Sequence, residues 1–181
     1  RHDAQPGDPQ TAAQLGAAMA LRGVDDASTV QRWIRAQGPV SPALLAAVRP
    51  VDATEPIVMW TYLYATTQLV APLAAGRGIV VPTAHNEAQL RFSPTRGVMN
   101  LAAGFAFLTP QERALVDDYF SLAGRPSAIV GAPLTPASPG DGGRGRRRHG
   151  LQQPFVLYVG RMDPGKGVYS LLVDHERYRR E

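Results

Sequence analysis

The sequence predicts an α/β fold in which parallel strands are joined by helical crossovers. Five short apolar runs, at residues 57–60, 78–81, 104–108, 128–130 and 155–159, have the length and composition of buried strands. Segments with helical spacing of apolar residues separate the first four runs, at residues 62–74, 87–102 and 110–122. This alternation is typical of a parallel sheet, because parallel strands need a crossover that is long enough to hold a helix.

Length and composition narrow the class of protein. A chain of 181 residues has room for one domain and the beginning of a second, and 44% hydrophobic with 19% charged residues is ordinary for a folded globular chain. The absence of cysteine excludes disulfides, thiolate metal centres and thiol nucleophiles. The apolar stretches are shorter than the roughly 20 residues of a membrane-spanning helix, and no signal-peptide pattern is present. We therefore expect a cytoplasmic protein without a transmembrane segment.

Residues 1–55 predict a helical lead-in to the sheet. Residues 11–22 are rich in alanine, and a second helix around Trp33 has Ser28 as its candidate N-cap. The pair Asp25 and Asp26 has the chemistry of a helix start. A short helix over residues 42–48 follows, with Ser41 as the cap and proline in its first turn.

The best-marked helix start in the crossover region is at Thr109. Thr109 and Glu112 have the spacing of a capping box, and proline occupies the first helical position between them.

The loop after the run at 78–81 contains His85. Ligands of parallel sheets bind beyond the carboxyl ends of the strands, so His85 is a candidate hydrogen-bonding or proton-handling residue; the alternative is an ordinary loop histidine. The remaining histidines lack metal-ligand spacing, so we expect no metal.

Residues 132–153 are rich in proline, glycine and arginine and have no apolar periodicity, which predicts a linker. A run of four arginines, Arg144 and residues 146–148, equals the whole net charge of +4. Nucleic-acid surfaces usually spread their charge over a face and interleave aromatic residues. The run therefore favours a solvated linker and makes no strong case for a nucleic-acid partner.

Beyond the linker, the sequence predicts a strand at 155–159, a glycine-rich turn and a helix at 168–180 with Leu171, Leu172 and Tyr178 facing inward. Gly160 and Gly167 let backbone amides approach an anion, and Arg161 and Lys166 add positive charge, which together suit a diphosphate. This assignment requires both cations to face a cavity. The turn also matches part of the P-loop pattern, but Gly167 stands where that pattern needs a serine or threonine for magnesium.

The segment Val159-Gly-Arg-Met-Asp-Pro-Gly-Lys-Gly167 resembles the opening of the nucleotide-binding domain in glycosyltransferase family 4, the retaining enzymes of GT-B fold. The stretches Val81-Pro-Thr-Ala-His-Asn-Glu87 and Phe107-Leu-Thr-Pro-Gln-Glu-Arg113 resemble the later part of the acceptor-side domain. The resemblance covers residue 28 to the end. It implies a partial Rossmann-like domain over residues 1–131, a linker over 132–153 and the start of a nucleotide-sugar-binding domain over 154–181.

The same resemblance implies a function and roles for residues. The enzyme would transfer a sugar from a nucleotide-sugar donor to an acceptor hydroxyl with retention, without a cofactor or an obligatory metal. The donor diphosphate would be held by Gly160, Arg161, Lys166 and Gly167, with His85 as the catalytic residue and Tyr62, Asn86 and Glu87 on the acceptor or sugar side. The family often has aspartate where this chain has Asn86.

Because other family motifs would lie outside residues 1–181, we expect a partial chain with little turnover alone. The alternative is a phosphate- or nucleotide-binding fragment, P-loop-like or otherwise, without catalysis. Oligomeric state, donor and acceptor are not indicated.

Overall fold

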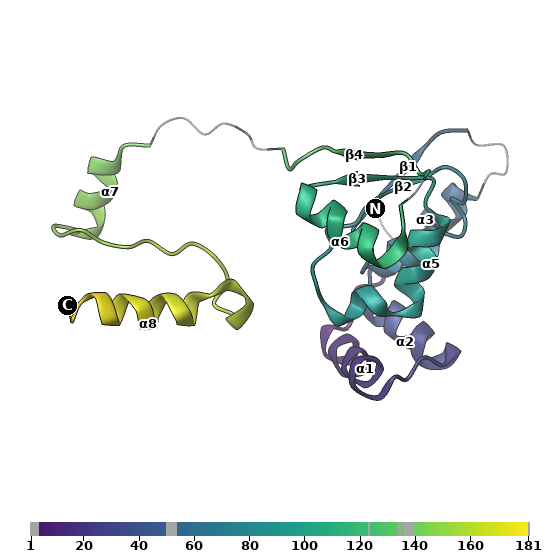
Figure 1. Ribbon diagram of the computed structural model, residues 1–181, viewed down its shortest axis with the longest axis horizontal. Coiled ribbons are helices and arrows are strands. Elements are labelled where there is room, and N and C mark those ends of the chain that lie inside the picture. The colour runs from purple at the N-terminus through teal and green to yellow at the C-terminus, as the bar shows by residue number, and fades with distance from the viewer. Residues whose placement is uncertain (1–3, 50–53, 123, 134, 136–139, 181) are drawn as a thin grey trace. The chain divides into compact units, whose positions relative to one another are not determined.

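The computed structural model describes residues 4–49, 54–122, 124–133, 135 and 140–180. The chain divides into two compact units, Arg1–Pro133 and Leu134–Glu181 (Figure 1). The first unit holds the sheet and its helices. The second holds two helices and the glycine-rich turn.

Three helices precede the sheet, as predicted: α1 (Pro9–Arg22), α2 (Ala27–Gln37) and α3 (Pro42–Val48). The cap predicted for α2 is wrong, because the helix begins earlier than Ser28. Asp26 is the N-cap, and its carboxylate accepts the backbone N–H groups of Ser28 and Thr29, each at 3.0 Å. Asp26 of the aspartate pair therefore supplies the helix start, whereas Asp25 accepts a hydrogen bond from the hydroxyl of Ser93, and Ser28 lies inside the helix. The cap predicted for α3 is confirmed, since Ser41 accepts the N–H of Leu44 at 3.3 Å.

The sheet is parallel throughout, which confirms the predicted α/β class. Its four strands are β1 (Ile57–Trp60), β2 (Gly78–Val81), β3 (Gly104–Phe107) and β4 (Ser127–Ile129), in the spatial order β1-β2-β3-β4. Met59 pairs with Val80, and Val80 pairs with Phe105. The first four of the five predicted runs therefore became strands, with ends shifted by one residue in β3 and β4.

The crossovers are α4 (Ala65–Val70), the 3-10 helix η1 (Ala88–Arg91) with α5 (Ser93–Leu101), and α6 (Pro110–Phe120). Two of them are less continuous than predicted. The helix expected from residue 62 starts later, because Thr61 has a left-handed φ of 56° and Tyr64 is extended. The helix expected over 87–102 breaks at Phe92, which is extended, because Pro94 has no N–H to continue a helix and starts α5 afresh.

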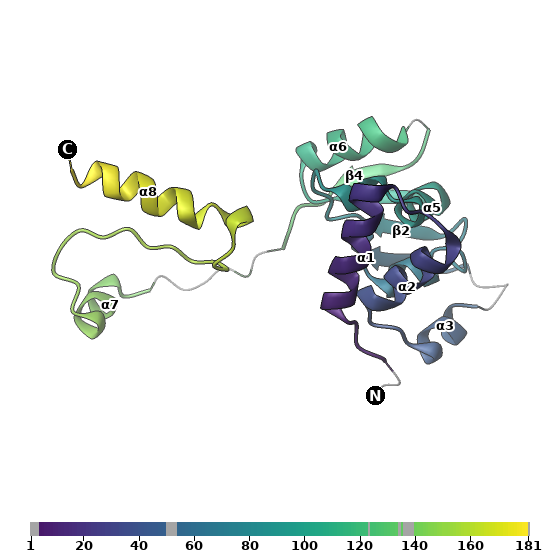
Figure 2. The same cartoon turned by 90° about the horizontal axis from the view of Figure 1, so that it is seen from below.

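Only one face of the sheet is covered by the described helices of the first unit. Right-handed crossovers that always step in the same direction place their helices on the same side, and α5 and α6 lie there (Figures 1 and 2). Met59 faces this layer, so its neighbours Val58 and Trp60 point to the other face. They are 61% and 54% exposed.

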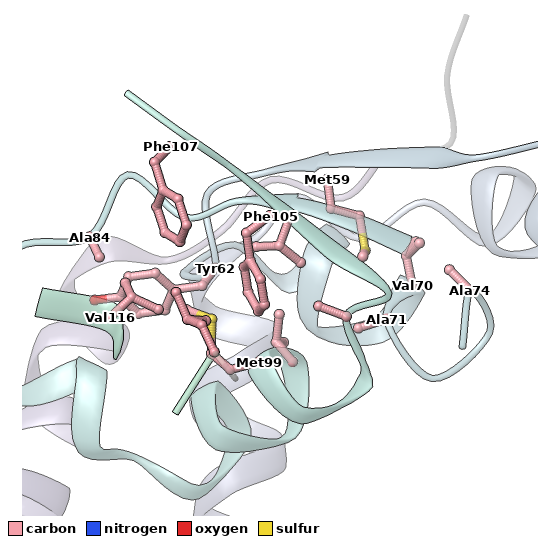
Figure 3. Packing of buried hydrophobic residues seen from close by; sticks show 14 of the residues in the cluster. Met59, Tyr62, Val70, Ala71, Ala74, Ala84, Met99, Phe105, Phe107 and Val116 are labelled. Atoms are coloured by element: carbon pink, nitrogen blue, oxygen red, sulfur yellow. The ribbon is translucent and has the colours of Figure 1, made fainter. Parts of the chain in front are cut away.

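The core lies between the sheet and α4, α5 and α6. Aromatic side chains of β3, Phe105 and Phe107, stack at 5.7 Å between ring centroids and contact the helical layer together with Met99 and Val116 (Figure 3). Tyr62 is fully buried in the same cluster. A smaller cluster joins Trp33 of α2 edge-on to Phe92, at 5.3 Å, and fixes the lead-in helices to η1 and α5.

The second unit differs from the prediction. Residues 142–149, expected as part of a linker, form helix α7 (Gly142–His149), capped by Asp141 at one end and left-handed Gly150 at the other. Arginine is a good helix former, so two caps allow a helix despite the glycines. Residues 134 and 136–139 of the expected linker lie outside the described residues.

The strand predicted at 155–159 is not formed. A strand needs a hydrogen-bonded neighbour, and the described part of residues 140–180 contains no second strand to pair with it. The predicted strand-turn-helix is therefore an irregular segment followed by the 3-10 helix η2 (Pro164–Lys166) and helix α8 (Val168–Tyr178). The predicted inward side is also wrong, since Leu172 and Tyr178 are 58% and 77% exposed, whereas Val168 is buried.

Candidate functional site at the carboxyl end of the sheet

A pocket of about 330 Å³ lies at the carboxyl ends of β2 and β3. It is formed by the loop after β2, the end of β3 and the first turns of α6. His85 and Asn86 are exposed at this pocket, and Glu112 is buried beside them. The lining residues are Thr83, Ala84, His85, Asn86, Leu108, Thr109, Gln111, Glu112 and Leu115.

The loop that carries His85 departs sharply from its strand. Thr83 has a left-handed φ of 54°, a conformation that threonine adopts rarely, and this turns the chain away from the β2 direction. Thr61 has the same feature after β1. Backbone hydrogen bonds join the two loops beyond the strands. The backbone N–H of Thr61 donates to the carbonyl of Val81 at 2.9 Å, and the backbone N–H of Tyr62 donates to the carbonyl of Pro82 at 3.3 Å.

The carboxylate of Glu112 connects two of the segments that line the pocket. Its Oε1 accepts the N–H of Ala84 at 2.9 Å, and its Oε2 accepts the N–H of Leu108 at 2.7 Å. The predicted Thr109 cap is present, since the Thr109 hydroxyl oxygen accepts the N–H of Glu112 at 3.0 Å. The second half of the capping box differs, because the glutamate satisfies N–H groups of two loops and not that of Thr109. One buried carboxylate thus fixes the loop of His85 against the start of α6.

Tyr62 and Glu87, which were also expected on the acceptor or sugar side, form a contact with each other. Tyr62 is fully buried, and its hydroxyl donates to Oε1 of Glu87 at 2.7 Å. Burial and this hydrogen bond raise the pKa of the Tyr62 phenol well above its usual 10.0. The ring of Tyr62 is therefore not available for stacking on a sugar in this structure. It supports Glu87, which is partly exposed, next to Asn86.

The two cations of the glycine-rich turn are exposed within the second unit. Arg161 is 80% exposed in its side chain and pairs with Asp163 at 3.5 Å, and Lys166 is exposed as well. Gly167 has a left-handed φ of 70° and begins α8 without a side-chain cap. The requirement that both cations face a cavity is thus not met by the unit alone, and the diphosphate role stays a prediction from sequence.

Two contributors to the pocket were not anticipated. The capping-box pattern marked Glu112 as a helix-start residue, but its bond to Ala84 spans 28 residues and has no signal in local sequence. Thr83 gave no sign of its left-handed backbone, since glycine and asparagine are the residues that usually adopt it. Within the described residues, no group of three or more His, Asp or Glu side chains could hold a metal ion, and no helix is long and apolar enough to span a membrane.

No protein-family model, curated protein or solved structure matches this chain.

Proposed function

We propose that this chain is part of a retaining glycosyltransferase of the family 4 type, which transfers a sugar from a nucleotide-sugar donor to an acceptor hydroxyl. The observation that carries the proposal is the position of His85 and Asn86 at a pocket beyond the carboxyl ends of β2 and β3. Ligands of parallel α/β sheets bind at this end of the strands. The sheet supports the more specific assignment to the Rossmann-like acceptor-side half of a GT-B fold.

The pocket offers the groups that a sugar requires. The imidazole of His85 and the amides of Asn86 and Gln111 both donate and accept hydrogen bonds, as sugar hydroxyls do. Leu108 and Leu115 supply apolar surface for the C–H faces of a sugar ring. An imidazole can also accept or donate a proton, which suits His85 to handle a proton at a hydroxyl.

In the proposed reaction, the bond between the anomeric carbon and the diphosphate oxygen breaks, and the acceptor oxygen bonds to the same face of that carbon. The acceptor hydroxyl gives its proton to the imidazole of His85, and the departing nucleoside diphosphate keeps the electron pair of the broken bond. Arg161, Lys166 and the amino end of α8 would stabilise the charge on that diphosphate without a metal. These roles come from the sequence motif and its resemblance. The expected cytoplasmic location belongs to the same proposal.

A second candidate is phosphate or nucleotide binding without catalysis. It is favoured by the amino end of α8, where Gly167 leaves the first backbone N–H groups without a side-chain cap. Lys166 precedes this end directly, and Arg161 lies in the same turn. The two candidates differ in whether the His85 pocket contributes to the binding of a nucleotide sugar.

Calorimetric titration of the chain with a panel of nucleotide sugars, and with the nucleoside diphosphates alone, tests both candidates. We expect His85→Ala to weaken nucleotide-sugar binding and to leave diphosphate binding unchanged, whereas Arg161→Ala with Lys166→Ala weakens both. The matched controls are His149→Ala and Arg177→Ala with Arg179→Ala, which remove a histidine and two positive charges elsewhere. If neither test variant changes any affinity, the site is misassigned. Rapid sugar transfer by the 181-residue chain alone would contradict the expectation of a partial enzyme.

A further inference from the structure

The positive charge of the protein is concentrated in its second unit. Residues 1–133 contain ten basic and ten acidic side chains, so this part of the chain is neutral. Residues 134–181 contain nine basic and five acidic side chains and therefore carry the whole net charge of +4. Helix α7 contributes four of the nine within eight residues.

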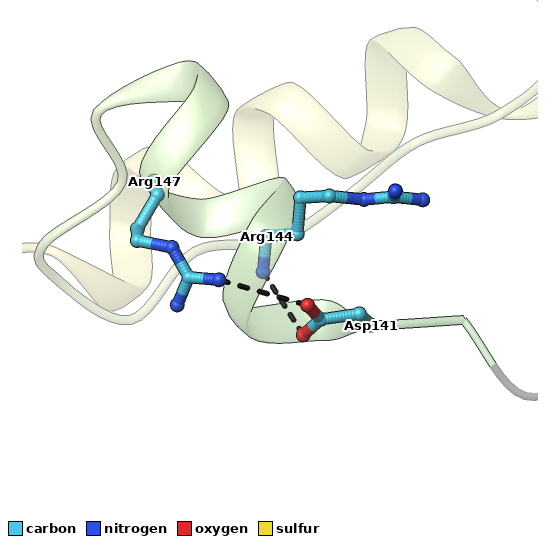
Figure 4. A network of polar contacts seen from close by, with 3 residues as sticks. All are labelled: Asp141, Arg144 and Arg147. Atoms are coloured by element: carbon cyan, nitrogen blue, oxygen red, sulfur yellow. Dashed lines mark hydrogen bonds and ion pairs between the residues drawn. The ribbon is translucent and has the colours of Figure 1, made fainter.

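Three arginines of α7 share one helix face. Arg144, Arg147 and Arg148 stand at positions i, i+3 and i+4, which are neighbours on an α-helix. The helix is fixed at its start by Asp141, whose carboxylate accepts the N–H of Arg144 at 3.0 Å and pairs with Arg147 at 3.6 Å (Figure 4). The Arg147 side chain is still 76% exposed, so this pair leaves its charge open to solvent.

An exposed apolar segment is attached directly to this basic helix. Arg146 faces that segment: its guanidinium lies 5.0 Å from the ring centroid of Phe155, and its carbonyl accepts the N–H of Leu151 at 2.9 Å. The segment then exposes aliphatic side chains to an unusual degree. Large exposed fractions are found for Val156 (62%), Leu157 (73%), Val159 (84%) and Met162 (68%).

We propose that the second unit is a membrane-surface binding element that recognises anionic lipid headgroups through α7 and inserts the exposed aliphatic side chains of Val156, Leu157 and Val159 into the interface. Clustered arginines attract an anionic lipid surface, and adjacent exposed aliphatic side chains gain from partial burial among the acyl chains. A single-stranded nucleic acid would also attract the charge, but it favours aromatic platforms for its bases. The apolar side chains of the segment that are more than 60% exposed are all Val, Leu or Met, and Phe155 is less exposed at 46%, which favours lipid.

The test is co-sedimentation of the full chain with vesicles of phosphatidylcholine alone and of phosphatidylcholine mixed equally with phosphatidylglycerol. We expect binding to the anionic vesicles only. Replacing Arg144, Arg147 and Arg148 together with Gln should weaken that binding about 100-fold, on the order of five-fold per arginine. The matched control replaces three exposed arginines of the first unit, Arg32, Arg35 and Arg49, with Gln and should bind like the original chain.

A second variant separates insertion from charge. Leu157→Ser with Val159→Ser keeps every charge, and we expect it to bind at low salt but to be released at a lower salt concentration than the original chain, because most of the apolar contribution is lost and the electrostatic attraction is screened by salt. Equal binding to neutral vesicles, no binding to anionic vesicles, or equal weakening by the control variant would overturn the proposal. Displacement of the chain from vesicles by a single-stranded oligonucleotide that binds more tightly would also overturn it, in favour of a nucleic-acid partner.

Discussion

Glu112 accepts a hydrogen bond of 2.9 Å from the backbone N–H of Ala84, which lies 28 residues earlier in the chain. The same carboxylate accepts the N–H of Leu108 at 2.7 Å, and the side chain is 6% exposed. Two loops that follow different strands therefore share one buried acceptor. The position of His85 depends on this contact, because Ala84 is its neighbour in the chain.

Replacing Glu112 with Gln should destabilise the protein by about 1–3 kcal/mol, because one of the two buried N–H groups would face an amide NH₂ and not an oxygen. The variant keeps the shape of the side chain, so packing changes little. Equilibrium unfolding in urea measures the effect. Glu55→Gln, at an exposed position, is the matched control and should change stability far less. Equal stability of both variants would mean that Glu112 does not hold the two loops.

Tyr62 should remain protonated in the folded protein at a pH where free tyrosine ionises. Burial and the hydrogen bond to Glu87 raise its pKa above the usual 10.0, so the folded state binds this proton more tightly than the unfolded state. The resulting contribution to stability is complete below about pH 10 and is lost as the pH rises further, because the unfolded state releases the proton.

Tyr62→Phe tests this directly. The variant should lose about 1 kcal/mol at pH 7, the contribution of one hydrogen bond, and its stability should fall less steeply than that of the original chain above pH 10. Tyr169→Phe, at a 54% exposed position, serves as the control. Parallel stability curves for the original chain and the Tyr62 variant at alkaline pH would contradict the buried, hydrogen-bonded phenol.

Asp26 should stabilise helix α2 only while it is ionised. Hydrogen bonds from Ser28 and Thr29 lower the pKa of Asp26 below its usual 3.8. The contribution is therefore present above about pH 4 and is lost as the pH falls toward the lower pKa of the folded state. Asp26→Ala should lower the thermal midpoint at pH 7, and the difference from the original chain should shrink in acid.

Asp26→Asn separates the cap from the charge. Asparagine caps helices as well as aspartate does, so this variant should be nearly as stable at pH 7 but should lack the acid-dependent loss. Thermal unfolding followed by circular dichroism from neutral to acid pH measures both variants. A constant difference between the original chain and Asp26→Ala across this range would show that the carboxylate does not act as the cap.

The two tryptophans should differ strongly in their accessibility. Trp33 is fully buried against Phe92, whereas Trp60 lies on the sheet face that the described helices of the first unit leave open and is 54% exposed. In Trp33→Phe, the remaining fluorescence from Trp60 should be quenched efficiently by acrylamide. In Trp60→Phe, the fluorescence of Trp33 should resist quenching. Strong shielding of Trp60 would mean that this face is covered in solution.

Local sequence was sufficient where an element is defined by its own residues. The strands β1 and β2 and helix α3 were predicted with their correct ends, because apolar runs, proline positions and caps act within a few residues. Where two neighbouring residues could both cap a helix, the sequence pattern predicted the wrong one. Asp26 and Ser28 are both acceptable N-caps, and the structure uses Asp26, whose carboxylate reaches two backbone N–H groups at once.

Sequence was least informative where an element depends on a distant partner. Residues 155–159 have the composition of a strand, yet a strand forms only beside another one, and the described second unit offers none. Helix α7 was expected as linker because its glycines outweighed the caps at its two ends. His85 could be placed beyond a strand from sequence, but the pocket beside it could not, since Glu112 reaches it from another crossover.

The alternation of apolar runs and helical segments by itself determined the parallel α/β class, because each segment carries its own hydrogen-bonding and burial pattern. The tertiary structure alone decided that the strands follow one another in a single direction, which leaves Val58 and Trp60 exposed on the face that no described helix of the first unit covers. It also decided that Tyr62 is a buried partner of Glu87 and that Glu112 fixes the loop of His85. These are contacts between residues 25 and 28 positions apart, and only the folded chain brings such residues together.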